Sequence, residues 1–161
     1  MSKSSVRIFV DADACPGVVK DIIMRAATSR KVQAIFVANK VLPLPASEFL
    51  KQETVAAGLD KADQFIAEDA DVRDLVVTAD VPLAHILVKK GIVAINPRGL
   101  IYTEDNIGDR ISVRDLLSDL RDAGEMTSGP KPFGDKEKRA FAASFDRVLT
   151  QLQRRFPTRE A

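Results

Sequence analysis

Short apolar runs rich in β-branched residues alternate along this chain with longer amphipathic stretches, and this alternation limits the fold more than any other feature. The short runs cover residues 6–10, 32–38, 74–78 and 92–95. Each is mostly apolar along its length, which is typical of strands that are covered on both faces in a parallel sheet. The pattern therefore predicts an α/β protein with three layers, in which helices flank a mostly parallel central sheet.

The stretches between these strands have the spacing of amphipathic helices. Pro16 suits the first turn of one helix, and Asp60 can cap the start of another. Residues 47–57 are compatible with a short helix or with an edge strand, and we favour the strand. The helices predicted between the strands cover residues 16–29, 60–69 and 81–90.

The C-terminal third has a different organisation. A helix is predicted over 112–122, and the Gly- and Pro-rich stretch 124–134 is predicted to be a flexible loop. A final helix over 135–154 is expected to pack back on the sheet, and residues 157–161 form a frayed tail. At 161 residues the chain is expected to form one domain. The apolar face of the final helix contains Phe141, Phe145, Val148, Leu149 and Leu152.

Cysteine and histidine each occur once, as Cys15 and His85. An intramolecular disulfide and a cysteine-based zinc cage are therefore excluded, and a reducing, cytoplasmic location is expected. The N-terminus lacks the apolar segment of a signal peptide, and the apolar runs fall short of a membrane span, so no membrane association is expected. Cys15 could be a reactive thiol at a helix start, but we favour a small buried side chain.

The net charge of +1 conceals an uneven distribution of charged residues. Residues 53–80 carry a net charge of −6, whereas residues 1–52 and residues 131–161 carry +4 each. One interpretation of the acidic block is a solvated helix surface. The other is a cluster of carboxylates flanked by basic segments, which suits a metal ion and a phosphate-rich substrate.

Oxygen-bearing side chains follow the predicted strands at the points where they end. Ligands of open parallel sheets bind beyond the carboxyl ends of the strands, so these side chains are candidates for one site. Asp and Asn are also common in turns and helix caps, which is the alternative explanation for each of them taken alone. The residues at these positions are Asp11, Asp13, Asn39, Asp80 and Asn96.

The spacing of two of these carboxylates predicts a site for a divalent metal ion. Asp11 and Asp13 are two residues apart, and if the strand continues they point to the same face, where their charges repel without a cation. Asp63 can add a third carboxylate from the predicted helix 60–69. The expected ion is Mg²⁺ or Mn²⁺, because these hard cations prefer oxygen ligands. His85 lies in an apolar helical stretch, which favours a structural role.

Such a metal site suits a nuclease or a phosphatase, because the ion can activate water and stabilise charge on a phosphate oxygen. The sequence contains no glycine-rich loop with the spacing of a nucleoside-triphosphate or dinucleotide site, so those functions have no support. The strand followed by Asp-x-Asp also fits an aspartate-nucleophile phosphatase, in which Asp11 would attack phosphorus. A third possibility is an RNA-binding module without catalysis, although stacking on bases would depend on Phe because Trp is absent.

Four motifs together resemble the bacterial YaiI/YqxD family of uncharacterised proteins. They are VDADACP at 10–16, VTADVPLA at 77–84, INPRG at 95–99 and GPKPF at 129–133, and they extend the resemblance over nearly the whole chain. The resemblance implies a fold similar to PIN-like and NYN-like ribonuclease domains, in which acidic residues at the edge of a parallel sheet hold divalent metal for RNA cleavage.

The preferred hypothesis is therefore a Mg²⁺- or Mn²⁺-dependent ribonuclease that acts on RNA, with single-stranded RNA as the expected partner. Catalysis is assigned to Asp11, Asp13 and Asp80, and the same three residues together with Asp63 are the expected metal ligands. Substrate binding is assigned to Asn39, Thr78, Asn96, Arg98, Lys131 and Lys138, where the resemblance points to Thr78, Asn96 and Arg98 and the basic C-terminal segment supplies the lysines.

Overall fold

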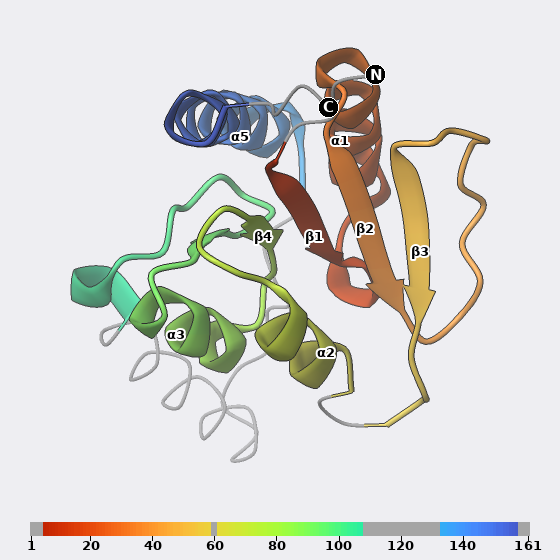
Figure 1. The fold of residues 1–161 in the computed structure, drawn as a ribbon, viewed down its shortest axis with the longest axis horizontal. Helices are drawn as coiled ribbons and strands as arrows, with labels where there is room; N and C mark the ends of the chain where they lie inside the picture. The colour runs from red at the N-terminus through yellow and green to blue at the C-terminus, as the bar shows by residue number, and fades with distance from the viewer. Residues whose placement is uncertain (1–4, 59–60, 108–132, 158–161) are drawn as a thin grey trace.

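A five-stranded sheet, parallel throughout, forms the centre of the protein (Figure 1). The computed structural model describes residues 5–58, 61–107 and 133–157. The strand order is β3-β2-β1-β4-β5, which places β1 in the middle of the sheet. The strands are β1 (Arg7–Asp11), β2 (Gln33–Ala38), β3 (Leu50–Thr54), β4 (Leu75–Val77) and β5 (Val93–Ile95).

Helices cover both faces of this sheet and produce the predicted three layers. Helices α1 and α5 pack on one face, whereas α2 and α3 pack on the other. The return of α5 to the sheet confirms the expectation for the C-terminal helix. The helices are α1 (Gly17–Arg30), α2 (Lys61–Asp69), α3 (Val81–Lys89) and α5 (Asp135–Arg155), and a short 3-10 helix, η1 (Ala12–Ala14), follows β1.

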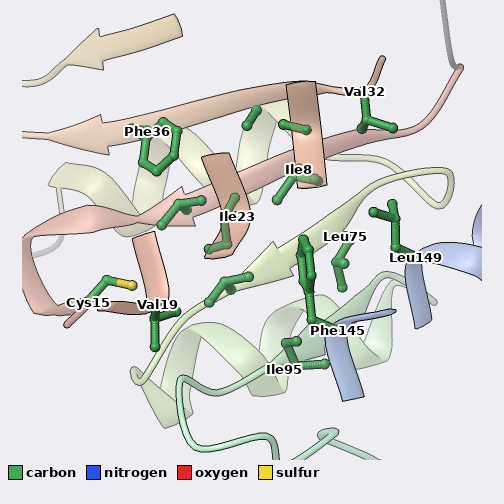
Figure 2. Packing of buried hydrophobic residues seen from close by; sticks show 14 of the residues in the cluster. Ile8, Cys15, Val19, Ile23, Val32, Phe36, Leu75, Ile95, Phe145 and Leu149 are labelled. Atoms are coloured by element: carbon green, nitrogen blue, oxygen red, sulfur yellow. The ribbon is translucent and has the colours of Figure 1, made fainter. Parts of the chain in front are cut away.

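Alternation of side chains along β1 explains why its three central residues, 8–10, are all apolar. Ile8 and Val10 belong to the core beneath α1 and α5, whereas Phe9 belongs to the core beneath α2 and α3. All three side chains are fully buried, so both faces of the strand require apolar residues at these positions. Figure 2 shows the first core, in which Phe145 and Leu149 of α5 approach the sheet.

The structure confirms the predicted strands with end shifts of at most one residue, and the ambiguous segment 47–57 contains an edge strand, β3. One detail was wrong. Pro16 precedes α1 as its N-cap, because its carbonyl oxygen already accepts hydrogen bonds from the N–H groups of Val19 and Lys20. Several predicted features lie outside the described residues. They are Asp60, the helix 112–122, the loop 124–134 except for its last two residues, and the tail beyond residue 157. Across the described ranges, no helix is both long and apolar enough to cross a membrane.

Candidate functional site

The carboxyl ends of β1, β2 and β4 meet at one edge of the sheet, beside a pocket of about 280 Å³. The chain runs outward from β1 through β2 to β3 and then returns to β4 on the other side of β1, so the strand order reverses at this point. Crevices at such reversals are the usual ligand sites of open α/β sheets. The charged and amide side chains that line this carboxylate pocket are those of Asp11, Asp13, Asn39, Lys61, Asp63 and Asp80.

Asp11 is the last residue of β1 and is only 9% exposed. Burial raises the pKa of its carboxyl group above the ordinary value, and the negative charges of Asp80 and Asp13 raise it further. A hydrogen bond of 3.0 Å from the Thr78 hydroxyl to Asp11 Oδ2 acts in the opposite direction and favours the ionised form. The carboxylate is thus held in a fixed position, in surroundings that disfavour its charge.

Thr78 links two of the predicted catalytic residues. Its hydroxyl donates to Asp11 and accepts a hydrogen bond of 3.0 Å from the backbone N–H of Asp80. The Thr78 carbonyl oxygen in turn accepts a hydrogen bond from the Tyr102 hydroxyl. Thr78 is 1% exposed, is engaged in these hydrogen bonds and is not among the residues that line the pocket, and its predicted contact with substrate stays a prediction.

Asp80 immediately precedes α3 and serves as its N-cap. Its Oδ1 accepts a hydrogen bond of 2.8 Å from the backbone N–H of Leu83, and Pro82 occupies the first turn, where proline is favoured. The cap fixes the carboxylate beside the pocket and occupies one of its two oxygens. The tripeptide Asp-Val-Pro, shortly after a predicted strand, was a sequence signal for this cap.

Asp13 reaches the carboxylate pocket from η1 rather than from a strand. Because β1 ends at Asp11, the expected alternation of strand side chains does not extend to Asp13. The Asp13 side chain is instead tied to the end of β2, where its Oδ2 accepts a hydrogen bond of 3.0 Å from the backbone N–H of Asn39. The two carboxylates still line one pocket, but they come from different backbone conformations.

Asp63 lies in the first turn of α2 and lines the same pocket. Within the described ranges, no three Asp, Glu, His or Cys side chains lie close enough together to hold one ion directly. Mg²⁺ commonly keeps several water ligands and binds to one or two carboxylates. The four carboxylates are therefore compatible with a hydrated divalent ion that some of them contact through water, and the metal site itself stays a prediction.

The polar side chains of the INPRG loop, residues 95–99, shape the loop itself and contact the start of α5. Asn96 Oδ1 accepts hydrogen bonds from the backbone N–H groups of Arg98 and Leu100, which shapes the loop. The Arg98 guanidinium lies 5.7 Å from the centroid of the Phe133 ring and 3.6 Å from a carboxylate oxygen of Glu137. These contacts hold the loop against the start of α5.

Only some of the other predicted substrate-binding residues lie at the carboxylate pocket. Asn39 lines the carboxylate pocket, whereas Asn96, Arg98 and Lys138 do not. Lys138 is exposed on α5, and Lys131 lies outside the described residues. The sequence placed Asn96 at the correct edge of the sheet, but the direction of its side chain depends on the loop that follows.

The structure also places the single cysteine and histidine. Cys15 is buried beside α1, and burial raises the pKa of its thiol to about 12. A thiol in this state is not a nucleophile near neutral pH, which supports the interpretation of a small buried side chain. His85 lies in α3 and does not line the carboxylate pocket.

Lys61 is the pocket residue that sequence reasoning missed. It is the first residue of α2 and lines the pocket together with the carboxylates. Its position next to Asp60 and two residues before Asp63 was the only signal available, because the approach of α2 to the sheet depends on the segment that follows β3.

The fold and the pocket define an α/β protein in which several carboxylates line a pocket at the point where the strand order of a parallel sheet reverses. The chain belongs to the family described as "Uncharacterized BCR, YaiI/YqxD family", whose sequence model matches residues 9–151. A UPF0178 protein of Myxococcus xanthus is 47% identical over 152 residues, which cover 94% of this chain and 99% of the relative. A UPF0178 protein of Desulfotalea psychrophila is 49% identical over 148 residues, with coverages of 92% and 100%. No solved structure matches the chain.

Proposed function

We propose that this protein is a Mg²⁺- or Mn²⁺-dependent ribonuclease that hydrolyses RNA phosphodiesters in the carboxylate pocket. The observation that supports the proposal is the convergence of Asp11, Asp13, Asp63 and Asp80 on one pocket where the strand order reverses. They come from β1, η1, α2 and the start of α3, so the fold, rather than a local charge run, brings them together.

In this proposal the pocket residues have different roles. A bound divalent ion would supply an activated water and stabilise charge on the phosphate oxygens. Asp11 and Asp80, held by Thr78, would be the best-positioned carboxylates to bind the ion. Asp13 and Asp63 would hold water molecules or complete the coordination, and the exposed Asn39 would contact the nucleotide.

Metal binding is tested first, by thermal unfolding with and without Mn²⁺. An ion bound only by the folded protein stabilises it by about 2.7 kcal/mol at a hundredfold excess over its dissociation constant. We expect Mn²⁺ to raise the unfolding temperature of the wild type and to lose this effect in Asp11→Asn. The control is Asp21→Asn, an exposed carboxylate on α1 outside the pocket, which should respond like the wild type.

Cleavage is tested with single-stranded RNA, Mn²⁺ and the Asp80→Asn variant. Asparagine caps a helix as well as aspartate does, so this variant keeps the start of α3 while it loses the charge. We expect cleavage by the wild type and by Asp21→Asn, and none by Asp80→Asn. Equal cleavage by Asp80→Asn would trace the activity to a contaminant and reject the proposal.

Two other outcomes would identify the alternatives. Turnover of small phosphomonoesters with a trapped aspartyl-phosphate at Asp11 would indicate a phosphatase. RNA binding that persists in EDTA, without cleavage in any divalent ion, would indicate a binding module. The burial of Asp11 and its bond to Thr78 count against the phosphatase, because a nucleophilic carboxylate must be open to the phosphate.

A further inference from the structure

Lys61 is a basic side chain in an otherwise acidic pocket. It lines the carboxylate pocket from the first position of α2. Its side-chain stem passes over Gly58, where a Cβ atom would lie 3.7 Å from Lys61 Cγ and 3.9 Å from Lys61 Cε. Gly58 has a φ of +145°, a conformation that other residues rarely adopt, so the turn before α2 favours glycine at this position.

The ammonium group of Lys61 is not used to neutralise the carboxylates. Among the described residues, it forms no ion pair within 4.0 Å and no hydrogen bond, although four carboxylates line the same pocket. By contrast, Arg7 and Arg30 form ion pairs with Asp74 and Asp146. A lysine that lines an acidic pocket without such a partner is available to an anionic ligand.

A pocket with four carboxylates repels a substrate that carries phosphate groups. The bound metal ion offsets part of this repulsion, and a second positive charge is needed near the phosphate oxygens that the ion does not reach. The predicted candidate Arg98 is committed to the start of α5, and Lys138 lies outside the pocket. Lys61 is the cation that lines the described part of the pocket.

We propose that Lys61 binds a non-bridging oxygen of the substrate phosphate and thereby selects phosphate-bearing ligands for this pocket. The inference rests on the proposed ribonuclease function, for which it names the anion-binding residue. A lysine suits the role because its ammonium group is a compact charge on a flexible stem, which can follow the phosphate.

The test compares two affinities that a phosphate-binding lysine must shift in opposite directions. Isothermal titration calorimetry measures the binding of Mn²⁺ alone, and then of AMP in the presence of saturating Mn²⁺. In Lys61→Met we expect AMP to bind about tenfold more weakly, which corresponds to about 1.4 kcal/mol. We expect Mn²⁺ alone to bind more tightly, because a repelling positive charge has been removed from the pocket.

Lys61→Arg keeps the charge and should retain most of the affinity for AMP. The matched control is Lys51→Met, an exposed lysine of β3 outside the pocket, which should change neither affinity. The inference is overturned if Lys61→Met binds AMP like the wild type, or if the wild type does not bind AMP. It is also overturned if both affinities fall together with the unfolding temperature, because that result indicates a structural role.

The outcome separates this inference from the proposed function. If the wild type cleaves RNA and Lys61→Met cleaves it equally well, the function stands and the role of Lys61 is rejected. If the wild type cleaves no RNA but AMP binding still depends on Lys61, the ribonuclease proposal is rejected and the phosphate-binding role stands.

Discussion

Replacing Thr78 by valine tests whether this residue holds the two central carboxylates in place. Valine keeps the shape of threonine but removes the hydroxyl, which makes two hydrogen bonds of 3.0 Å. A bond to a charged acceptor contributes about 1.5–3 kcal/mol, and a neutral bond about 1 kcal/mol. Because Thr78 is buried and water cannot replace the hydroxyl, we expect Thr78→Val to lower the free energy of unfolding by about 3 kcal/mol near neutral pH.

The pH dependence of this loss shows which carboxylate is involved. The Thr78 hydroxyl favours the ionised form of Asp11, so its loss raises the already raised pKa of that group further. A raised carboxyl pKa means that the folded protein binds protons more tightly than the unfolded chain, so the stability falls as the pH rises from about 4. Thr78→Val should therefore fall further behind the wild type at about pH 8 than at about pH 4, where much of Asp11 is protonated.

Urea unfolding of the metal-free protein at the two pH values measures these losses. Thr78→Ser is the control, because it keeps the hydroxyl and loses one methyl group, at a cost of about 0.5–1.5 kcal/mol. The reasoning is refuted if Thr78→Val costs less than about 1 kcal/mol, if its cost is the same at both pH values, or if Thr78→Ser is equally unstable.

Three further predictions concern the scaffold. Gly99→Ala should lower the free energy of unfolding in urea by about 2 kcal/mol or more, because a Cβ at this φ of +94° would lie 2.6 Å from the Ala140 carbonyl oxygen. A smaller loss would mean that α5 shifts easily. Asp74→Ala should cost about 3 kcal/mol in the same assay, because the fully buried carboxylate accepts bonds from Arg7, and a neutral result would contradict this. Hydrogen bonding by Arg73 lowers the pKa of Asp71, so the stabilisation from the ionised Asp71 is present near neutral pH and is lost as the pH falls below about 4. Arg73→Gln should therefore reduce the dependence of the unfolding free energy on pH in this range, and an unchanged dependence would refute this.

The fold could be predicted from the sequence because its central strands are buried on both faces. The runs around Phe9 and Val76 had to be apolar along their length, and this requirement is visible without a structure. The edge strand β3 gave a weaker signal, since Leu50 is its only buried residue and the polar Lys51 and Glu53 face solvent. The start of α1 was misplaced by one residue because a proline fits both the N-cap and the first turn.

The position of the candidate site could also be predicted, since the ends of parallel strands meet at one edge regardless of the loops. The roles of individual residues could not. Thr78 and Asp80 share a short motif, yet one side chain turns into the core towards Asp11 while the other caps α3. The direction of Arg98 depends on Glu137 and on the return of α5, which no local pattern contains.

The four carboxylates of the pocket are held with unequal rigidity, and this affects how a metal ion can be bound. Asp11 ends β1 and Asp80 follows β4, these two strands pair with each other, and Thr78 hydrogen-bonds to both residues. Asp13 belongs to a single 3-10 turn, and Asp63 belongs to a nine-residue helix that follows a glycine turn. A small ion that demands regular geometry is best served by the rigid pair, with the other two carboxylates acting through water. Because no three described carboxylates lie close enough together to hold one ion directly, this division is compatible with a pocket that would accept both a hydrated ion and the phosphate proposed to bind Lys61.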